Sequence, residues 1–150
     1  METKLTHNTH EYGQCLFGLA GEYLEAAEVL HDCRNAKWLP MYYLICHSLE
    51  LSLKSFLSER GYDEKRLKGI GHSIKKCLVE AEGSGLRFSI PPPEANELLE
   101  LDEHYTVKSL EYFYDKSKIF PNAKDLITFT KHLRSVVFNE ITLAEFHEMR

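Results

Sequence analysis

The sequence predicts an all-α fold, an up-and-down bundle of about five helices, from three observations. Apolar residues recur at i, i+3, i+4 and i+7 spacing in several long segments, which is the period of a helix with one buried face. No segment alternates convincingly as a half-buried strand does, and the connections between the periodic segments are short. With 150 residues, we expect a single domain over 1–150 with its core at about 10–140.

The first expected helix runs from about Tyr12 to the Arg34-Asn35 pair. The second begins near Pro40, which suits a first helical turn because its missing N–H costs nothing there, and it ends before Gly61. The buried stripe expected on the first helix consists of Tyr12, Cys15, Leu16, Leu19, Tyr23, Ala26, Ala27, Leu30 and Cys33.

The second helix has apolar residues on two sides. Its main stripe consists of Tyr42, Ile45, Cys46, Leu49, Leu53, Phe56 and Leu57. Leu44 and Leu51 project almost opposite to that stripe, at ~100° per residue. We therefore expect this helix to be the central element of the bundle and also part of a homodimer interface that includes Leu44 and Leu51.

Turns and prolines divide the rest of the chain. Residues 61–71 read as a turn-rich stretch, followed by a shorter helix that Gly83-Ser84-Gly85 closes. Pro91-Pro92-Pro93 predicts an extended connector into a helix from about Glu94, and residues 107–119 show no clean period. The closing helix is expected from Asn122, an N-cap, to Asn139, with a capping box at 142–145 that opens a last short turn. The helix after the prolines would bury Ala95, Leu98, Leu99, Leu101 and Tyr105.

Composition argues against several classes of protein. Net charge is −5 and hydrophobic residues make up 43%, with no apolar run near the ~20 residues of a membrane span and no secretory start, so we expect a cytoplasmic protein without a membrane contact. The four cysteines form no C-x-x-C pair and read as buried apolar residues rather than as zinc or redox sites. Scattered histidines and the lack of a phosphate loop or dinucleotide fingerprint predict neither a metal nor a cofactor.

Charge is concentrated in residues 60–76. This stretch has six cations against Asp63 and Glu64, a net charge of +4, which leaves −9 for the rest of the chain. A basic segment in an acidic protein can bind phosphate, although a solvated loop is the alternative interpretation. The cations are Arg60, Lys65, Arg66, Lys68, Lys75 and Lys76.

Two motifs stand in the central part of the chain. His47, Glu50, Lys54 and Leu57 form the pattern H-x-x-E-x-x-x-K-x-x-L on the second expected helix, and a segment from Gly71-His72 to Leu78 follows after a loop. Both motifs resemble those of the HEPN-like helical superfamily, in which such a helix is followed by a loop and a helix that opens on Gly-His. The resemblance covers roughly residues 10–140, and its specific part is residues 44–78.

The resemblance implies an up-and-down helical bundle that commonly dimerises. The superfamily includes metal-independent endoribonucleases of toxin and defence systems, nucleotide-binding partners of nucleotidyltransferases, and members without catalytic activity. We therefore expect a dimeric module that binds RNA or a nucleotide in a toxin–antitoxin or defence context, with a nucleotidyltransferase as a possible partner protein. A metal-independent endoribonuclease and a non-catalytic scaffold for a partner enzyme are the alternatives.

Active members of the superfamily resemble one another in an R-x(4–6)-H motif near the start of the closing helix. Here the spacing is matched by Arg66 and His72, which lie in a different loop, while the closing helix has no such pair. An arginine can hold a scissile phosphate and a histidine can transfer a proton, so these two residues are the catalytic candidates. In the alternative interpretation, His72 only caps or orients the third helix.

His47, Glu50 and Lys54 share one face of the second helix, because offsets of three and seven residues return to the same side. This face could form a polar pocket between helices that His72 reaches. It could equally hold a structural ion pair between Glu50 and Lys54 beside a satisfied histidine. The candidate binding residues are His47, Glu50, Lys54, Arg60, Lys65, Lys68, Lys75 and Lys76.

Overall fold

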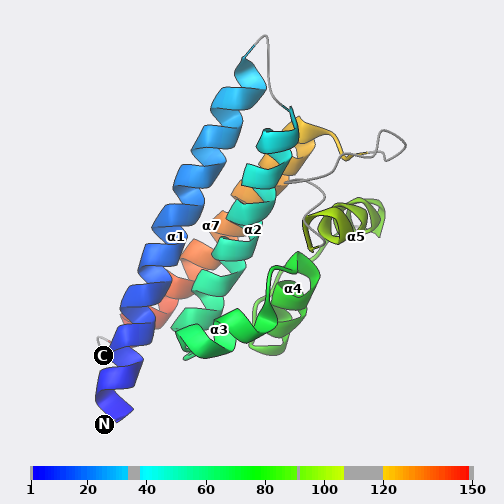
Figure 1. The fold of residues 1–150 in the computed structure, drawn as a ribbon. Helices are drawn as coiled ribbons and strands as arrows, with labels where there is room; N and C mark the ends of the chain where they lie inside the picture. Colours follow the sequence, from blue (N-terminus) through cyan, green and yellow to red (C-terminus); the bar gives the residue numbers. More distant parts are fainter. Residues whose placement is uncertain (1, 34–37, 91, 107–119, 149–150) are drawn as a thin grey trace.

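A computed structural model describes residues 2–33, 38–90, 92–106 and 120–148, and this part of the chain is helical without strands. The all-α prediction is therefore confirmed (Figure 1). Residues 107–119, which show no clear hydrophobic period, lie outside the described residues. The described helices are α1 (Glu2–Asp32), α2 (Trp38–Glu59), α3 (Glu64–Ile70), α4 (Ile74–Gly83), α5 (Pro92–Thr106) and α7 (Ala123–Glu148).

Helix α2 is the central element of the bundle, as its two apolar sides predicted. It contacts α1, α3, α4, α5 and α7. The long helices α1, α2 and α7 run along one another, and the shorter α3, α4 and α5 follow the other side of α2 (Figure 1). Every residue from Ser48 to Ser58 is buried, because neighbouring helices cover α2 from all sides.

The side chains of Leu51 and Leu44 pack against other residues of the same chain. Leu51 is only 7% exposed, and Leu44 is half-buried against the core. The two-sided apolar character of α2 therefore requires no second subunit, and Leu51 does not lie on the surface. The homodimer stays a prediction, and light scattering of the wild-type chain tests it.

Small residues set the packing of α1 against α2. Gly13, Ala20 and Ala27 are seven residues apart and buried, so they repeat along one line of α1. A Cβ at Gly13 would lie 3.0 Å from the carbonyl oxygen of Ser55. Ser48 Oγ donates a hydrogen bond of 2.7 Å to the carbonyl of Ala20. The two backbones therefore approach closely, with serine rather than leucine at the contact.

This close approach rotates α1 away from the orientation that the apolar stripe predicted. Leu16 and Ala27 are buried as expected, but Leu19 is 41% exposed, since the buried line passes through Ala20 and Leu24 instead. Cys15, Ala26 and Cys33 are exposed as well. The prediction of buried cysteines holds for Cys46 and Cys77 and is wrong for the two cysteines near α1.

The segment predicted as turns contains α3. Asp63 is its N-cap and accepts a hydrogen bond of 2.8 Å from the backbone N–H of Arg66. Leu67 is 2% exposed and anchors the helix to the core. Gly71 ends it with φ of 78°, a left-handed conformation that glycine adopts without strain. The described residues thus contain six helices where the sequence predicted five.

Three other helix ends differ from the prediction. Helix α1 begins at Glu2 rather than near Tyr12. Helix α5 begins at Pro92 rather than near Glu94, because first-turn N–H groups need no intrahelical partner and proline fits there. Asn122 caps α7 as expected and accepts a 3.1 Å hydrogen bond from the N–H of Asp125. The prediction of a capping box at 142–145 is wrong, because α7 continues through these residues. Thr142 Oγ1 instead donates a hydrogen bond of 2.8 Å to the carbonyl of Phe138, one turn earlier in the same helix.

Among the described residues, no helix is both long enough and apolar enough to cross a bilayer.

Candidate functional site

A buried carboxylate lies where α2, α5 and the turn between α3 and α4 meet. Glu50 is 1% exposed. Its Oε1 accepts hydrogen bonds from the Tyr105 hydroxyl at 2.8 Å and from His72 Nδ1 at 3.0 Å, and its Oε2 accepts from Lys54 Nζ at 3.2 Å. Burial of an ionised carboxylate is costly unless donors surround it, and here three side chains do so. We call Glu50, Lys54, His72, Tyr105 and His47 the Glu50 network.

Lys54 connects this network to the backbone of the turn. Its Nζ donates to the carbonyl of Gly71 at 2.8 Å as well as to Glu50, and the residue is 7% exposed. The predicted ion pair between Glu50 and Lys54 is thus confirmed, as is the approach of His72. Lys54 holds Gly71, the residue directly before His72, so the position of His72 depends on two side chains of α2.

His47 joins the network through Tyr105. Its Nδ1 lies 2.8 Å from the Tyr105 hydroxyl. That hydroxyl has one proton, which goes to Glu50, so Nδ1 of His47 is the donor and this contact fixes the tautomer. The ring packs edge-on against Tyr23 and is stacked on Tyr43, with centroids 4.6 Å and 5.8 Å apart. His47 is therefore half-buried and held by contacts within the bundle, which favours the interpretation of a satisfied histidine.

Tyr105 has a role that the sequence analysis missed, since it was counted only as a buried apolar residue. Burial raises the pKa of its hydroxyl, and the negative charge of Glu50 raises it further. The hydroxyl therefore stays protonated and donates. A buried tyrosine usually needs a hydrogen-bond partner for its O–H. The place of Tyr105 in a predicted buried stripe was therefore the one signal in the sequence for a polar partner.

Asp102 is a second buried carboxylate that the sequence analysis missed. It is 6% exposed and accepts from the backbone N–H groups of Ile74 and Lys75, at 2.6 Å and 3.2 Å, and from Ser73 Oγ at 3.0 Å. Ser73 Oγ in turn accepts from the N–H of Lys76 at 3.2 Å. An α5 side chain thus caps α4, and the first N–H groups of α4 already have acceptors.

The six cations of residues 60–76 lie on α3, on the first turn of α4 and beside them. Arg60 pairs with Glu140 at 3.4 Å, and Lys68 pairs with Glu64 at 3.0 Å. The remaining lysines, Lys65, Lys75 and Lys76, are exposed, and within the described residues no acidic side chain pairs with them. Arg66 is also exposed without an acidic partner among these residues, so four of the six cations are available to an external anion.

Arg66 and His72, the pair with catalytic spacing, have different partners. The guanidinium of Arg66 lies over the ring of Tyr62, 3.6 Å from its centroid. His72 binds Glu50, and its side chain is 63% exposed. The structure therefore brings His72 together with the predicted polar face of α2, while Arg66 belongs to the surface of α3.

The described residues contain no group of three or more His, Cys, Asp or Glu side chains that could hold a metal ion.

Comparison with known proteins gives no relative. No family model, no curated protein and no solved structure matches the chain. The likeness to the HEPN-like superfamily therefore remains a resemblance in residues 44–78.

Proposed function

We propose that this chain is a helical module that binds the phosphate of RNA or of a nucleotide on the surface of α3, the 71–73 turn and the first turn of α4. We call this region the basic surface. The observation that carries the proposal is the Glu50 network, which fixes the turn with His72 exposed. His72 is followed at once by Ser73, Ile74 and the exposed pair Lys75 and Lys76.

The position of these two lysines supports a binding role. The N-terminal end of a helix dipole is positive and disfavours cations, yet the first turn of α4 contains Lys75 and Lys76 and no acidic residue. The carboxylate of Asp102, which belongs to α5, supplies the negative charge that the first turn of α4 lacks. Residues that oppose local stability and need compensation elsewhere are often functional.

The mode of phosphate binding follows from the capping of α4. Because Asp102 and Ser73 occupy the first N–H groups, a phosphate would be bound by side chains rather than by the helix end. Lys65, Lys75 and Lys76 supply point charges. Arg66 supplies a planar guanidinium that can bind phosphate with two hydrogen bonds or stack on a base.

The test is charge reversal with a matched control. We expect Lys75→Glu with Lys76→Glu to reduce the affinity for a fluorescent single-stranded RNA at least tenfold at low salt, measured by anisotropy. This change also favours the α4 dipole, so the variant should fold. Lys124→Glu with Lys131→Glu makes the same change of charge on α7. Equal losses in the two variants would contradict a localised site, and competition by ATP distinguishes a nucleotide from RNA.

One observation favours a second candidate, a metal-independent endoribonuclease. Glu50 holds Nδ1 of His72, so Nε2 is the ring nitrogen that could transfer a proton to or from a ribose hydroxyl. Cleavage of mixed RNA in EDTA that His72→Ala abolishes would support this activity. Arg66→Ala tests the sequence-based pair separately. If the wild-type protein leaves the RNA intact, the nuclease proposal is excluded and only the binding module remains.

A further inference from the structure

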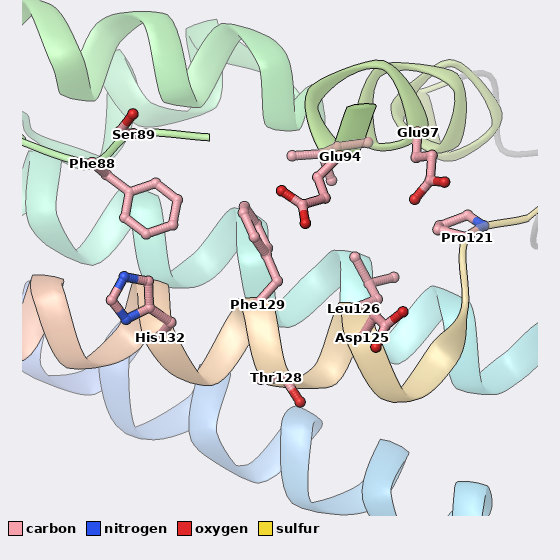
Figure 2. A pocket seen from close by; sticks show the side chains of 11 residues that line it. Phe88, Ser89, Glu94, Glu97, Pro121, Asp125, Leu126, Thr128, Phe129 and His132 are labelled. Carbon is pink, nitrogen blue, oxygen red and sulfur yellow. The ribbon is translucent and has the colours of Figure 1, made fainter. Parts of the chain in front are cut away.

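A cavity of about 450 Å³ opens between α5, the 86–90 segment and α7 (Figure 2). Its apolar part includes Phe88, Leu98 and Phe129. The rings of Phe88 and Phe129 meet edge-to-face with centroids 5.3 Å apart. The volume is within the range of pockets that bind small molecules, which are mostly apolar with a few polar groups.

The acidic groups of this cavity are three carboxylates from two helices, and its other polar lining residues are Ser89, Thr128 and His132. Glu94 and Glu97 extend from α5 toward α7, and Asp125 lies on α7 (Figure 2). All three residues are exposed, and within the described parts of the chain none pairs with a cationic side chain. The cavity therefore combines apolar walls with unneutralised negative charge.

Helix ends account for part of this charge. Glu94 and Asp125 lie in the first turns of α5 and α7, where the helix dipole favours acidic residues. Each helix end contributes only about +0.5 charge, so two ends leave roughly −2 of the three negative charges in place. Glu97 lies beyond the first turn and has no such explanation. The field in the cavity attracts a cation.

We infer that the cavity binds a small organic cation, a protonated amine on an apolar body. The body would pack on Phe88, Leu98 and Phe129, and the ammonium would lie near Glu94, Glu97 and Asp125. Aromatic faces attract cations, which adds to the attraction of the carboxylates. The site shares no residue with the basic surface, so it does not depend on the proposed function.

The probe for the test is phenethylamine, with neutral 2-phenylethanol and anionic 3-phenylpropionate as analogues of similar shape. We expect calorimetry or NMR titration to give saturable binding of the amine with a Kd on the order of 1 mM, as its nine non-hydrogen atoms allow. The amine should bind at least tenfold more tightly than the alcohol. Equal binding of the two, or no saturation by the amine, would overturn the inference.

Variants place the binding at this cavity. Glu94→Gln with Glu97→Gln should weaken amine binding at least tenfold. Glu100→Gln with Glu103→Gln makes the same change of charge at exposed positions of α5 that do not line the cavity, and it should leave the affinity unchanged. Similar losses in both double variants would mean that only the general field attracts the amine, and this too would overturn the site.

Discussion

Two sets of carboxylates differ sharply in their surroundings. Glu50 and Asp102 are 1% and 6% exposed, and each accepts hydrogen bonds from three groups. Glu94, Glu97 and Asp125 are exposed at the rim of a cavity, and within the described residues no cation pairs with them. The first set holds helices together. The second set is the one on which the proposed amine site depends.

The comparison separates stability from binding. The free energy of unfolding decreases when a buried carboxylate loses its hydrogen-bond donors. It decreases likewise when the donors lose their carboxylate. An exposed carboxylate contributes little to that free energy. We therefore expect substitutions in the first set to change stability and substitutions in the second set to change ligand affinity.

The largest effect is expected for Glu50→Ala. The change leaves the buried ammonium of Lys54 without its counter-ion and removes the acceptor of Tyr105 and His72. We expect a loss of about 3–5 kcal/mol of unfolding free energy in urea denaturation. Glu103→Ala, on the exposed side of α5, should cost less than about 0.5 kcal/mol. A loss at Glu50 as small as at the control would show that the network is not structural.

Asp102→Ala is expected to cost about 2–3 kcal/mol, because it removes the cap of α4 and leaves buried N–H groups without an acceptor. Asp102→Asn keeps one oxygen acceptor and should fall between the alanine variant and the wild type. Urea denaturation measures both, and helix content by circular dichroism checks that α4 is the element affected. Identical stability of the alanine variant and the wild type would refute the cap.

A pH dependence should follow from the thiol beside the Glu50 network. Burial raises the pKa of Cys77 from 9.0 to about 12, so above pH 9 the thiol ionises in the unfolded chain while it stays neutral in the fold. Stability is therefore complete below pH 9 and falls as pH rises toward 12. We expect Cys77 to account for a loss of about 2 kcal/mol between pH 7.5 and 10.5. The free energy of unfolding of Cys77→Ala and of the wild type is measured at each pH across this range. Equal losses in the two proteins would disprove the assignment.

The smallest effect on stability is expected at the cavity. Glu94→Gln with Glu97→Gln should change the unfolding free energy by no more than about 0.5 kcal/mol, because these side chains have no cationic partner among the described residues. Thermal denaturation at low and at physiological salt checks this. A large destabilisation would mean that the exposed carboxylates are structural after all, and the comparison between the two sets would fail.

Local patterns predicted the helices and one face of the site. His47, Glu50 and Lys54 were placed together because helical spacing fixes their relative positions, and Asn122 was recognised as a cap from its neighbours. The seven residues of α3 are too few for a periodic stripe, although Asp63 and Gly71 mark its ends.

Apart from the approach of His72 to Glu50, contacts between distant residues could not be predicted. Tyr105 meets Glu50 across 55 positions of the chain, and Asp102 meets Ile74 across 28. No local pattern encodes such a pair, since it depends on how α5 packs against α2 and α4. The exposure of Leu19 has the same origin, because Ala20 and Gly13 let α1 approach α2 along a different line.

Asp102 also links the motion of α5 to that of α4. Its carboxylate belongs to α5 and holds the amides of Ile74 and Lys75 at the start of α4. Those amide hydrogens can exchange with deuterium only when α5 moves away or α4 frays. Their exchange rates therefore set an upper limit on how often α5, the helix that forms one wall of the cavity, detaches from α4.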